Sequence, residues 1–489
     1  MSEFLTAIRQ RTDNPIWDFF DQICRIPRPS KHEQALANYI INWATKLGLA
    51  VKQDKTGNLF ISKPATPGME NLKGVVLQAH LDMVAQKNEG CDHDFFNDPI
   101  KPYIDGDWVK AQDTTLGADN GIGLASCLAV LADKNIKHGP LEVLLTVDEE
   151  AGMGGAFGLE AGWLNGEILL NTDSEQEGEV YMGCAGGVDG EFTLPLERRA
   201  LKEGYQTFAI ALKGLRGGHS GVNIDAGRAN ANKLLARFLH QAQRNLALQL
   251  LDIHGGTLRN AIPREAFATV AIASENADPL RQALVEFCAL IRQEYADIEP
   301  NITFTLEAVE SSLAPLTDVC QTKVINLLNA CPNGVTKMSE EVRGVVETSL
   351  NVGVVTCQEN TVSIMCLIRS LIDSGREYIE QQLTALGELA QAQVKFSGAY
   401  PGWKPEPNSP IMAIFRDMYQ EIYGHKPNIM VIHAGLECGL FKEPYPEMDM
   451  LSFGPTIQYP HSPDEQVHIG SVDLYWQQMR ALLAAIPAK

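Results

Sequence analysis

The sequence has few of the features that mark secreted, membrane-bound or nucleic-acid-binding proteins. No apolar run approaches the roughly 18 residues of a membrane-spanning helix, and the first residues lack the charged-then-apolar pattern of a secretory signal. The ten cysteines are scattered without a CxxC pair, which is typical of reduced thiols. The net charge of −21 argues against nucleic acid and anionic membranes as partners. We therefore expect a cytoplasmic protein that binds neither.

The rest of the composition is ordinary for a globular protein, with 45% hydrophobic and 21% charged residues. A chain of 489 residues is too long for one compact core. Near residue 187 the segments shorten and β-branched alternation increases, and a Pro/Gly-rich stretch at 397–410 ends this region. We predict a catalytic domain formed by 1–186 and 402–489, interrupted by an inserted α+β domain over 187–401.

Apolar strands alternate with a buried helix in the first of these segments. The strands are expected within 72–82, 140–150 and 166–175, and a helix of small and apolar residues over 119–133. This alternation predicts an α/β fold whose mostly parallel sheet is flanked by helices. Ligands of such sheets bind beyond the carboxyl ends of the strands, and each of these strands ends in acidic residues or histidine.

His80 and Asp82 end the first of these strands, in the stretch GVVLQAHLDMV. Side chains two residues apart on an extended segment point to the same side, so both would face one cleft. A surface histidine beside a turn aspartate would explain the pair equally well. The wider pattern decides between these interpretations.

Potential metal ligands stand at apparent strand or helix ends in five places. They are His80, Asp119, the pair Glu149 and Glu150, Asp173 and His461. Zinc accepts imidazole and carboxylate, and a catalytic zinc keeps one position open for water. Five protein ligands are too many for one catalytic zinc, but they suit two ions if one carboxylate bridges them.

The two adjacent glutamates of the stretch VDEE can have different roles, one as a metal ligand and one as a general base. Glu150 is the candidate ligand, and Glu149 is the candidate general base that takes a proton from a metal-activated water. Asp82 could orient His80 through the second ring nitrogen of the imidazole.

Structural explanations exist for each residue taken alone. Asp119 could cap the helix that follows it, Asp173 could be a turn residue, and His461 could be an exposed loop histidine. A serine hydrolase is excluded for GGHSG, because the glycine that a nucleophile elbow needs two residues after Ser220 is replaced by Val222. The metal hypothesis is favoured because the candidate ligands occur together.

The motifs HLD, GADNGIG, DEEAGMGG, NTD and PHSPDE, in this order, resemble those of the di-zinc metallopeptidase family that includes aminoacylases, carboxypeptidases and dipeptidases. The resemblance covers nearly the whole chain. It implies a bridging aspartate, two zinc sites, a general base and a catalytic aspartate near the metals, and a peptide bond after the bridging aspartate that is often cis. The implied assignment is Asp119 as the bridge, His80 and Asp173 at one zinc, Glu150 and His461 at the other, Glu149 as the base and Asp82 as the catalytic aspartate.

The inserted region resembles the lid domain of the same family. The resemblance implies that His219 in LRGGHSGVNIDAGRANA polarises the scissile carbonyl and that Asn260 in GGTLRNAIPREA contacts substrate. Where relatives often have a second histidine, this chain has Asn223. Arg369 could hold the terminal carboxylate of the substrate as a bidentate partner. His219 and Asn260 could equally shape turns, and Arg369 could be a surface or ion-pair arginine.

The resemblance implies hydrolysis of dipeptides, including Xaa-His and β-alanyl-histidine substrates, by a metallodipeptidase with two zinc ions. Manganese or cobalt could occupy the same ligands. A homodimer is a possible assembly. An N-acyl amino acid deacylase, a tripeptidase or a non-catalytic binding protein on the same framework are the alternatives.

Overall fold

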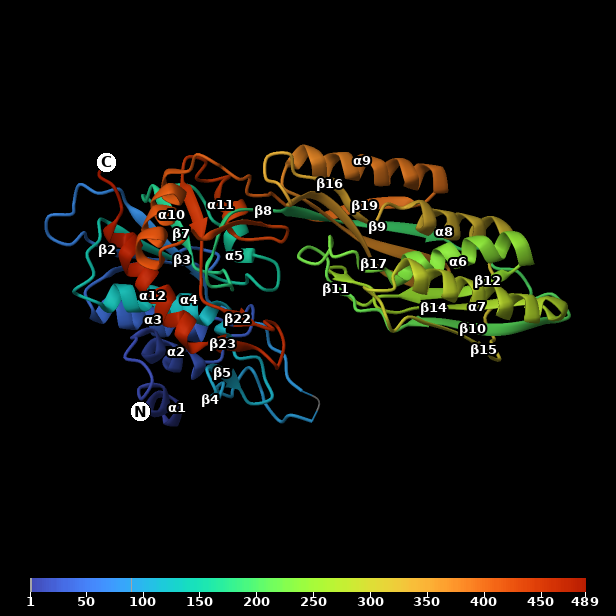
Figure 1. Cartoon of the computed structure of the whole chain (residues 1–489), viewed down its shortest axis with the longest axis horizontal. Coiled ribbons are helices and arrows are strands. Elements are labelled where there is room, and N and C mark those ends of the chain that lie inside the picture. Colours follow the sequence, from blue (N-terminus) through green and yellow to red (C-terminus); the bar gives the residue numbers. More distant parts are fainter. Residues whose placement is uncertain (1, 89) are drawn as a thin grey trace. The chain divides into compact units, whose positions relative to one another are not determined.

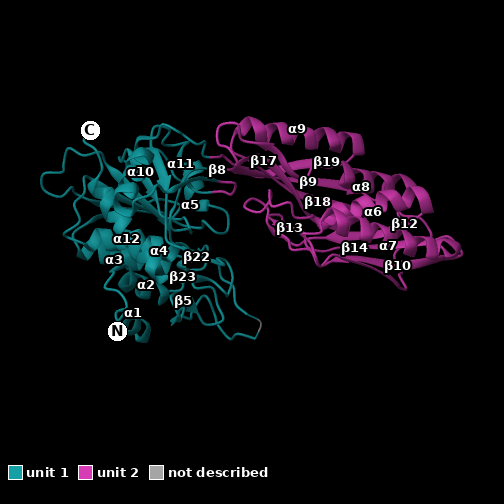
Figure 2. Cartoon of the chain, viewed as in Figure 1, with its two compact units in different colours: residues 1–184, 403–431, 436–489 teal, residues 185–402, 432–435 magenta. Residues whose placement is uncertain are grey.

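The structure is a computed structural model that describes residues 2–88 and 90–489. The chain forms two compact units, which Figure 2 distinguishes by colour. Unit 1 contains Met1–Cys184, Trp403–Val431 and Leu436–Lys489, and unit 2 contains Ala185–Gly402 and Ile432–Gly435. Unit 1 is therefore assembled from segments far apart in the sequence.

The main sheet of unit 1 has the strand order β1-β2-β6-β3-β7-β21-β8-β20 (Figure 1). Its inner strands β6, β3, β7 and β21 run parallel, whereas β1, β2 and β8 pair antiparallel with their neighbours. The strands are β1 (Ala50–Gln53), β2 (Leu59–Lys63), β3 (Val75–His80), β6 (Leu141–Thr146), β7 (Ile168–Asn171), β8 (Glu179–Cys184), β20 (Asn428–Ile432) and β21 (Asp449–Ser452).

Strand β3 lies at the centre of this sheet and is buried along its whole length. Burial on both faces explains why Val75, Val76, Leu77 and Ala79 of this strand do not alternate with exposed polar residues. Helix α4 packs against β3 and α2, and its small residues and lack of a polar face fit this buried position. The helices of unit 1 are α1 (Glu3–Ile8), α2 (Ile16–Cys24), α3 (Gln34–Lys46), α4 (Ala118–Ala132), α5 (Gly154–Phe157), α10 (Pro410–Tyr423), α11 (Cys438–Phe441) and α12 (Ile469–Ala484).

A small antiparallel sheet joins residues 102–111 to the C-terminal part of the chain within unit 1. Its order is β22-β23-β5-β4, so residues near 110 pair with residues near 467. The strands are β4 (Pro102–Asp105), β5 (Trp108–Ala111), β22 (Ile457–Gln458) and β23 (Gln466–His468). This pairing places the loop that contains His461 near the segment that precedes α4.

Unit 2 is built on an antiparallel sheet with the order β15-β10-β14-β12-β17-β18-β9-β19, and β16 pairs with β17. A separate two-stranded antiparallel sheet pairs β11 with β13. The strands are β9 (Gly186–Pro195), β10 (Tyr205–Lys213), β11 (Gly218–His219), β12 (Gln249–Gly255), β13 (Ala261–Ile262), β14 (Ala266–Ala273), β15 (Thr303–Ala308), β16 (Gly334–Met338), β17 (Val346–Cys357), β18 (Thr361–Ser370) and β19 (Gln393–Tyr400). The helices are α6 (Ala231–Leu246), α7 (Ala277–Glu294), α8 (Asp318–Ala330) and α9 (Asp373–Ala390), with a 3-10 turn at Ser274–Asn276.

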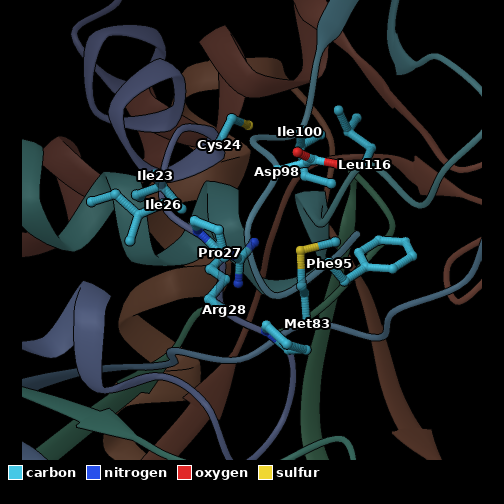
Figure 3. Close-up of a pocket in the computed structure, with 11 residues that line it drawn as sticks. Ile23, Cys24, Ile26, Pro27, Arg28, Met83, Phe95, Asp98, Ile100 and Leu116 are labelled. Atoms are coloured by element: carbon cyan, nitrogen blue, oxygen red, sulfur yellow. The ribbon is translucent and has the colours of Figure 1, made fainter. Parts of the chain in front are cut away.

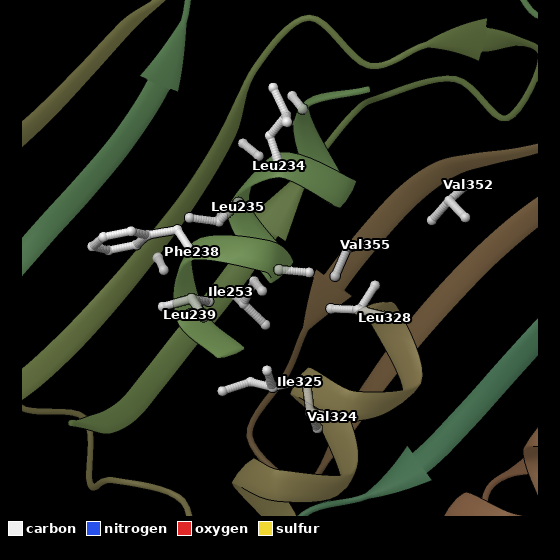
Figure 4. Close-up of a cluster of buried hydrophobic side chains, with 14 of the residues drawn as sticks. Leu234, Leu235, Phe238, Leu239, Ile253, Val324, Ile325, Leu328, Val352 and Val355 are labelled. Carbon is white, nitrogen blue, oxygen red and sulfur yellow. The ribbon is translucent and has the colours of Figure 1, made fainter. Parts of the chain in front are cut away.

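The core of unit 2 lies between these helices and the sheet (Figure 4). Helix α6 repeats apolar residues every three or four positions, so Leu235, Phe238 and Leu239 lie on one buried face. They belong to the same cluster as Ile253 of β12 and Val355 of β17. The mixed α/β architecture with an antiparallel α+β unit agrees with the predicted fold class.

Among the described residues, no helix is long and apolar enough to cross a membrane. None of the ten cysteines forms a disulfide in the described part of the chain.

Candidate metal centre and active site

The predicted ligands of unit 1 follow the carboxyl ends of neighbouring parallel strands. His80 is the last residue of β3, and it pairs in register with Thr146, the last residue of β6. Asp173 follows the end of β7, which pairs with β3 on its other side. Because parallel strands end at the same edge of a sheet, the segments that carry the ligands meet there.

The side chains of five predicted ligands converge at this edge. His80 Nε2 lies 3.2 Å from Asp119 Oδ1 and 3.4 Å from Asp173 Oδ1. His461 Nε2 lies 3.1 Å from Asp119 Oδ2 and 3.0 Å from Glu150 Oε2. The two oxygens of Asp119 therefore face different histidines, which is the arrangement that a bridging carboxylate requires.

Potential ligand atoms form two adjacent groups that share Asp119. One group joins it to His80 and Asp173, and the other joins it to Glu150 and His461; within each group the atoms lie within 4.8 Å of one another. The Oε1 atom of Glu150 is buried and has no hydrogen-bond partner among the described residues. Imidazole and carboxylate donors with an unpaired buried oxygen fit divalent cations, so the cluster is a possible metal site.

Crowding of acidic groups shifts their pKa values. Burial raises the pKa of Glu149 well above its ordinary value, and Glu150 adds to the shift. Burial and then Asp119 raise the pKa of Glu150 to about 7. Burial lowers the pKa of His461, but Asp119 and Glu150 outweigh this effect and raise it to about 11. Shifts of this kind gather at functional sites, and bound cations would stabilise the ionised carboxylates.

Asp82 links His80 to the turn that carries the two glutamates. Its Oδ1 lies 3.3 Å from His80 Nδ1 and accepts the N–H of Glu149 at 3.0 Å, while its Oδ2 accepts the N–H of Glu150 at 3.1 Å. Its side chain is fully buried. The backbone carbonyl of Asp82 also lies 3.1 Å from His80 Nδ1, so Asp82 contacts both the imidazole and the backbone of the glutamate turn. Its orienting role stays a prediction.

Ser30 and Glu33 have the Ser-x-x-Glu spacing of a helix capping box, but their side chains bind to the region around Asp82 instead. Ser30 Oγ donates to Asp82 Oδ2 at 2.7 Å, and Glu33 accepts the N–H of Asp148 at 2.9 Å. Helix α3 has no side-chain cap. The cap that this spacing predicts does not form, because Ser30 binds Asp82 and Glu33 accepts the N–H groups of Lys31 and Asp148. Asp119 lies at a kink near the start of α4, and its two oxygens face His80 and His461.

Gln78 and Asn171 are buried polar residues that lie two positions before His80 and Asp173. Gln78 accepts a hydrogen bond from Asn171 at 2.5 Å, and Asn171 accepts others from Ser452 and from the N–H of Asp173. Glu437 accepts from Gln78 at 2.6 Å. The sequence analysis missed these residues, although polar residues two positions before a ligand in a buried strand are an available signal.

Unit 2 brings His219 and Arg369 together. His219 Nδ1 accepts backbone N–H groups from Gly221 at 3.2 Å and Val222 at 3.0 Å, so the neutral ring carries its proton on Nε2. That Nε2 lies 3.5 Å from Nη2 of Arg369, which is only 5% exposed and has no partner for its Nε among the described residues. Two converging donors of this kind can bind one oxygen acceptor between them.

Asn260 lies beside His219 through the pairing of β11 with β13. Its carbonyl accepts the N–H of Ser220 at 2.9 Å, and its neighbour Ala261 pairs with His219. The residue is exposed, so its amide is accessible. Asn223, which stands where relatives often have histidine, accepts the N–H of His219 at 3.0 Å. It therefore orients the backbone of the histidine.

The peptide bond between Asp119 and Asn120 is cis, as the family resemblance implied.

Comparison with known proteins gives matches along nearly the whole chain. A peptidase dimerisation domain matches residues 210–299. The cytosol non-specific dipeptidase of Escherichia coli K12 is 58% identical over 485 residues, which cover 99% of this chain and 100% of that protein. The crystal structure of aminoacylhistidine dipeptidase from Vibrio alginolyticus matches with a TM-score of 0.87 and 65% identity over 98% of each chain. The aminopeptidase PepT from Bacillus cereus ATCC 10987 shares the fold, with a TM-score of 0.55 and 17% identity over 96% of this chain and 98% of its own.

Proposed function

Because the chain belongs to the dipeptidase family of the M20 metallopeptidases, we propose that it hydrolyses dipeptides at a centre of two divalent cations held by unit 1. The single observation that carries the proposal is the position of Asp119, whose two oxygens face different histidines. Zinc suits this ligand set, and manganese or cobalt are substitutes. By analogy with the relatives, dipeptides ending in histidine are among the substrates.

The ligands would be shared between the two ions through one bridge. His80 and Asp173 would hold one ion, Glu150 and His461 the other, and Asp119 both. Bound cations would polarise the scissile carbonyl and lower the pKa of a water molecule to near neutrality. Side chains of the protein would orient the ligands and transfer the proton.

Glu149 would be the general base. One of its oxygens lies within 4.8 Å of ligand atoms of His80 and Glu150, and burial raises its pKa above its ordinary value, the direction that makes a carboxylate a stronger base. It would accept a proton from the attacking water and pass it to the leaving amino group. Asp82 would hold the N–H of Glu149 and the ring of His80 in place.

His219 and Arg369 of unit 2 would bind the oxygen atoms of the substrate. The N–H at His219 Nε2 suits an oxyanion that forms on the scissile carbonyl. The buried guanidinium of Arg369, steadied by Tyr400 at 3.0 Å, suits the terminal carboxylate. Asn260 would add a hydrogen bond from its exposed amide. Anchoring of both substrate ends would restrict the enzyme to short peptides.

Arg369→Lys is expected to lower kcat/KM for dipeptides by about 10- to 100-fold, because lysine cannot form the paired hydrogen bonds of a guanidinium. The measurement is steady-state kinetics on Xaa-His substrates, with metal content determined in parallel. Arg237→Lys is a matched control in unit 2, where the arginine forms a paired contact with Glu294. Equal activity of the Arg369 and Arg237 variants would exclude the carboxylate role.

Removal of divalent cations with a chelator is expected to abolish dipeptide hydrolysis, and two equivalents of zinc per chain should restore it. The test is a panel of dipeptides, tripeptides and N-acetyl amino acids before and after chelation. Preference for free dipeptides supports the proposal. Preference for N-acetyl amino acids would identify a deacylase, preference for tripeptides a tripeptidase, and absence of all hydrolysis a binding protein.

The match to a peptidase dimerisation domain leads us to propose a homodimer formed through unit 2. We place the activity in the cytosol, the compartment in the name of the Escherichia coli relative. Small peptides are the only ligands that the proposal requires besides the cations.

A further inference from the structure

The segment 116–119, which leads to Asp119, is held by the buried carboxylate of Glu465. Glu465 is only 2% exposed. Its Oε2 accepts the N–H groups of Leu116 at 2.8 Å and Gly117 at 2.9 Å, and its Oε1 accepts the N–H of Asp119 itself at 3.2 Å. A single carboxylate therefore satisfies three backbone donors around the proposed bridging ligand.

A buried guanidinium binds the same segment through a carbonyl. Arg28 is also 2% exposed, and its Nη2 donates to the carbonyl of Gly117 at 2.6 Å. Its Nη1 donates to the carbonyls of Leu81 at 2.9 Å and Asp82 at 2.6 Å, directly after His80. Figure 3 shows Arg28 in the pocket that it lines with Cys24, Met83 and Leu116.

Gly117 permits this close approach. Its φ of 68° lies in the left-handed region, and a Cβ at this position would lie 2.7 Å from Arg28 Nη2 and 2.9 Å from Met83 Sδ. Any side chain would therefore displace the guanidinium or the loop. The glycine lets the arginine reach the backbone directly.

The two charged groups connect three segments that carry proposed ligands. Arg28 joins the end of β3, with His80 and Asp82, to Gly117. Glu465 follows His461 by four residues and joins that loop to Asp119. A buried charge is costly unless it is hydrogen-bonded, and here backbone groups from separate segments supply the bonds. Loss of either charged side chain would remove the hydrogen bonds that hold these segments together. The distances from Asp119 to the two histidines depend on how these segments are held.

We propose that Arg28 and Glu465 are positioning residues that hold Asp119 between His80 and His461 and thereby set the affinity for cations. This inference rests on the proposed metal centre. Neither residue contacts a cation or substrate in this account; each acts through the backbone of the ligand segments. Partners of ligand residues commonly change metal affinity by about 10- to 100-fold when they are removed.

Glu465→Gln tests the role of the carboxylate. Glutamine keeps the volume, but its Nε2 group would face at least one backbone N–H that the carboxylate now accepts. We expect zinc affinity, measured by calorimetry on the chelator-treated full chain, to fall by at least about tenfold. We also expect the rise in melting temperature on addition of zinc to shrink, because stabilisation by a ligand depends on its affinity.

Glu299→Gln is the matched control. Glu299 is 1% exposed and accepts the N–H groups of Arg216 at 2.8 Å and Ala229 at 3.1 Å in unit 2, where none of the proposed ligands lies. Its loss should lower the melting temperature of the metal-free protein and leave the zinc-induced rise unchanged. A purely structural role of Glu465 would give the same result as this control, and that outcome would overturn the inference.

Arg28→Lys supplies a second test if the Glu465 variant does not fold. Lysine has one nitrogen in place of the two that now serve Gly117 on one side and Leu81 and Asp82 on the other, so the link between these segments is lost and zinc affinity should fall in the same way. Arg198→Lys is its control, since Arg198 of unit 2 donates to the carbonyls of Leu251 and Ala314. Unchanged zinc affinity in Arg28→Lys would contradict this inference but not the proposed function. Absence of zinc binding by the unmodified chain would instead contradict the proposed function.

Discussion

Replacement of Glu149 by alanine is expected to reduce dipeptide hydrolysis by about 10²- to 10⁴-fold, the usual contribution of a general base, while bound metal persists. Glu149 is not among the five proposed ligands, so its loss removes proton transfer and leaves the donors of both cations in place. The measurement combines kcat on a dipeptide with metal analysis of the same sample.

Glu160→Ala provides the control for this variant. Glu160 is an exposed acid of the same unit that forms an ion pair with Lys55, so its removal should change neither activity nor metal content. Unchanged hydrolysis in Glu149→Ala would disprove the assignment of the base. Loss of metal together with activity would mean that Glu149 is itself a ligand.

Asp119→Ala should have the largest effect on metal binding, since both proposed sites share this carboxylate. We expect the bound metal to fall from two ions per chain to none at micromolar zinc, with loss of detectable hydrolysis. Its two oxygens lie 3.2 Å from His80 Nε2 and 3.1 Å from His461 Nε2, so its removal weakens both groups of ligands at once. Metal analysis after dialysis measures this loss.

Asp173→Ala distinguishes a bridge from an ordinary ligand. Asp173 contacts His80 and belongs only to the first group, so its loss should remove one ion and spare the other. Asp105→Ala, which removes a surface acid paired with Lys110, should leave two ions bound. If Asp119→Ala lost no more metal than Asp173→Ala, Asp119 would not be a bridge.

Much of the ligand cluster could be predicted from the sequence because it follows a simple rule. Ligands at the ends of β3 and β7 stand where apolar runs stop, and parallel strands bring such ends together. The order of the motifs then singled out Asp119 and His461, which lie on other segments. The roles of these residues stay predictions that the metal measurements test.

Residues that support the ligands could not be predicted in the same way. Ser30 and Glu33 have the spacing of a helix cap, yet their partners are Asp82 and the backbone of Asp148. Arg28 and Glu465 bind carbonyl and N–H groups that are 53 to 349 residues away. A backbone group looks the same at every position of a sequence, so no local pattern reveals such contacts.

The tautomer of His219 also depended on the fold. Its Nδ1 accepts backbone N–H groups two and three residues ahead, which requires the loop that Asn223 stabilises. The resemblance named the histidine, but only the folded loop indicates which ring nitrogen is the donor.

Anomalous diffraction at the zinc absorption edge, from crystals of the zinc-loaded protein, tests the central claim most directly. We expect two anomalous peaks about 3.5–4 Å apart, each about 2.0–2.2 Å from a different oxygen of Asp119. A single peak, or a pair of peaks in which only one contacts Asp119, would contradict the claim.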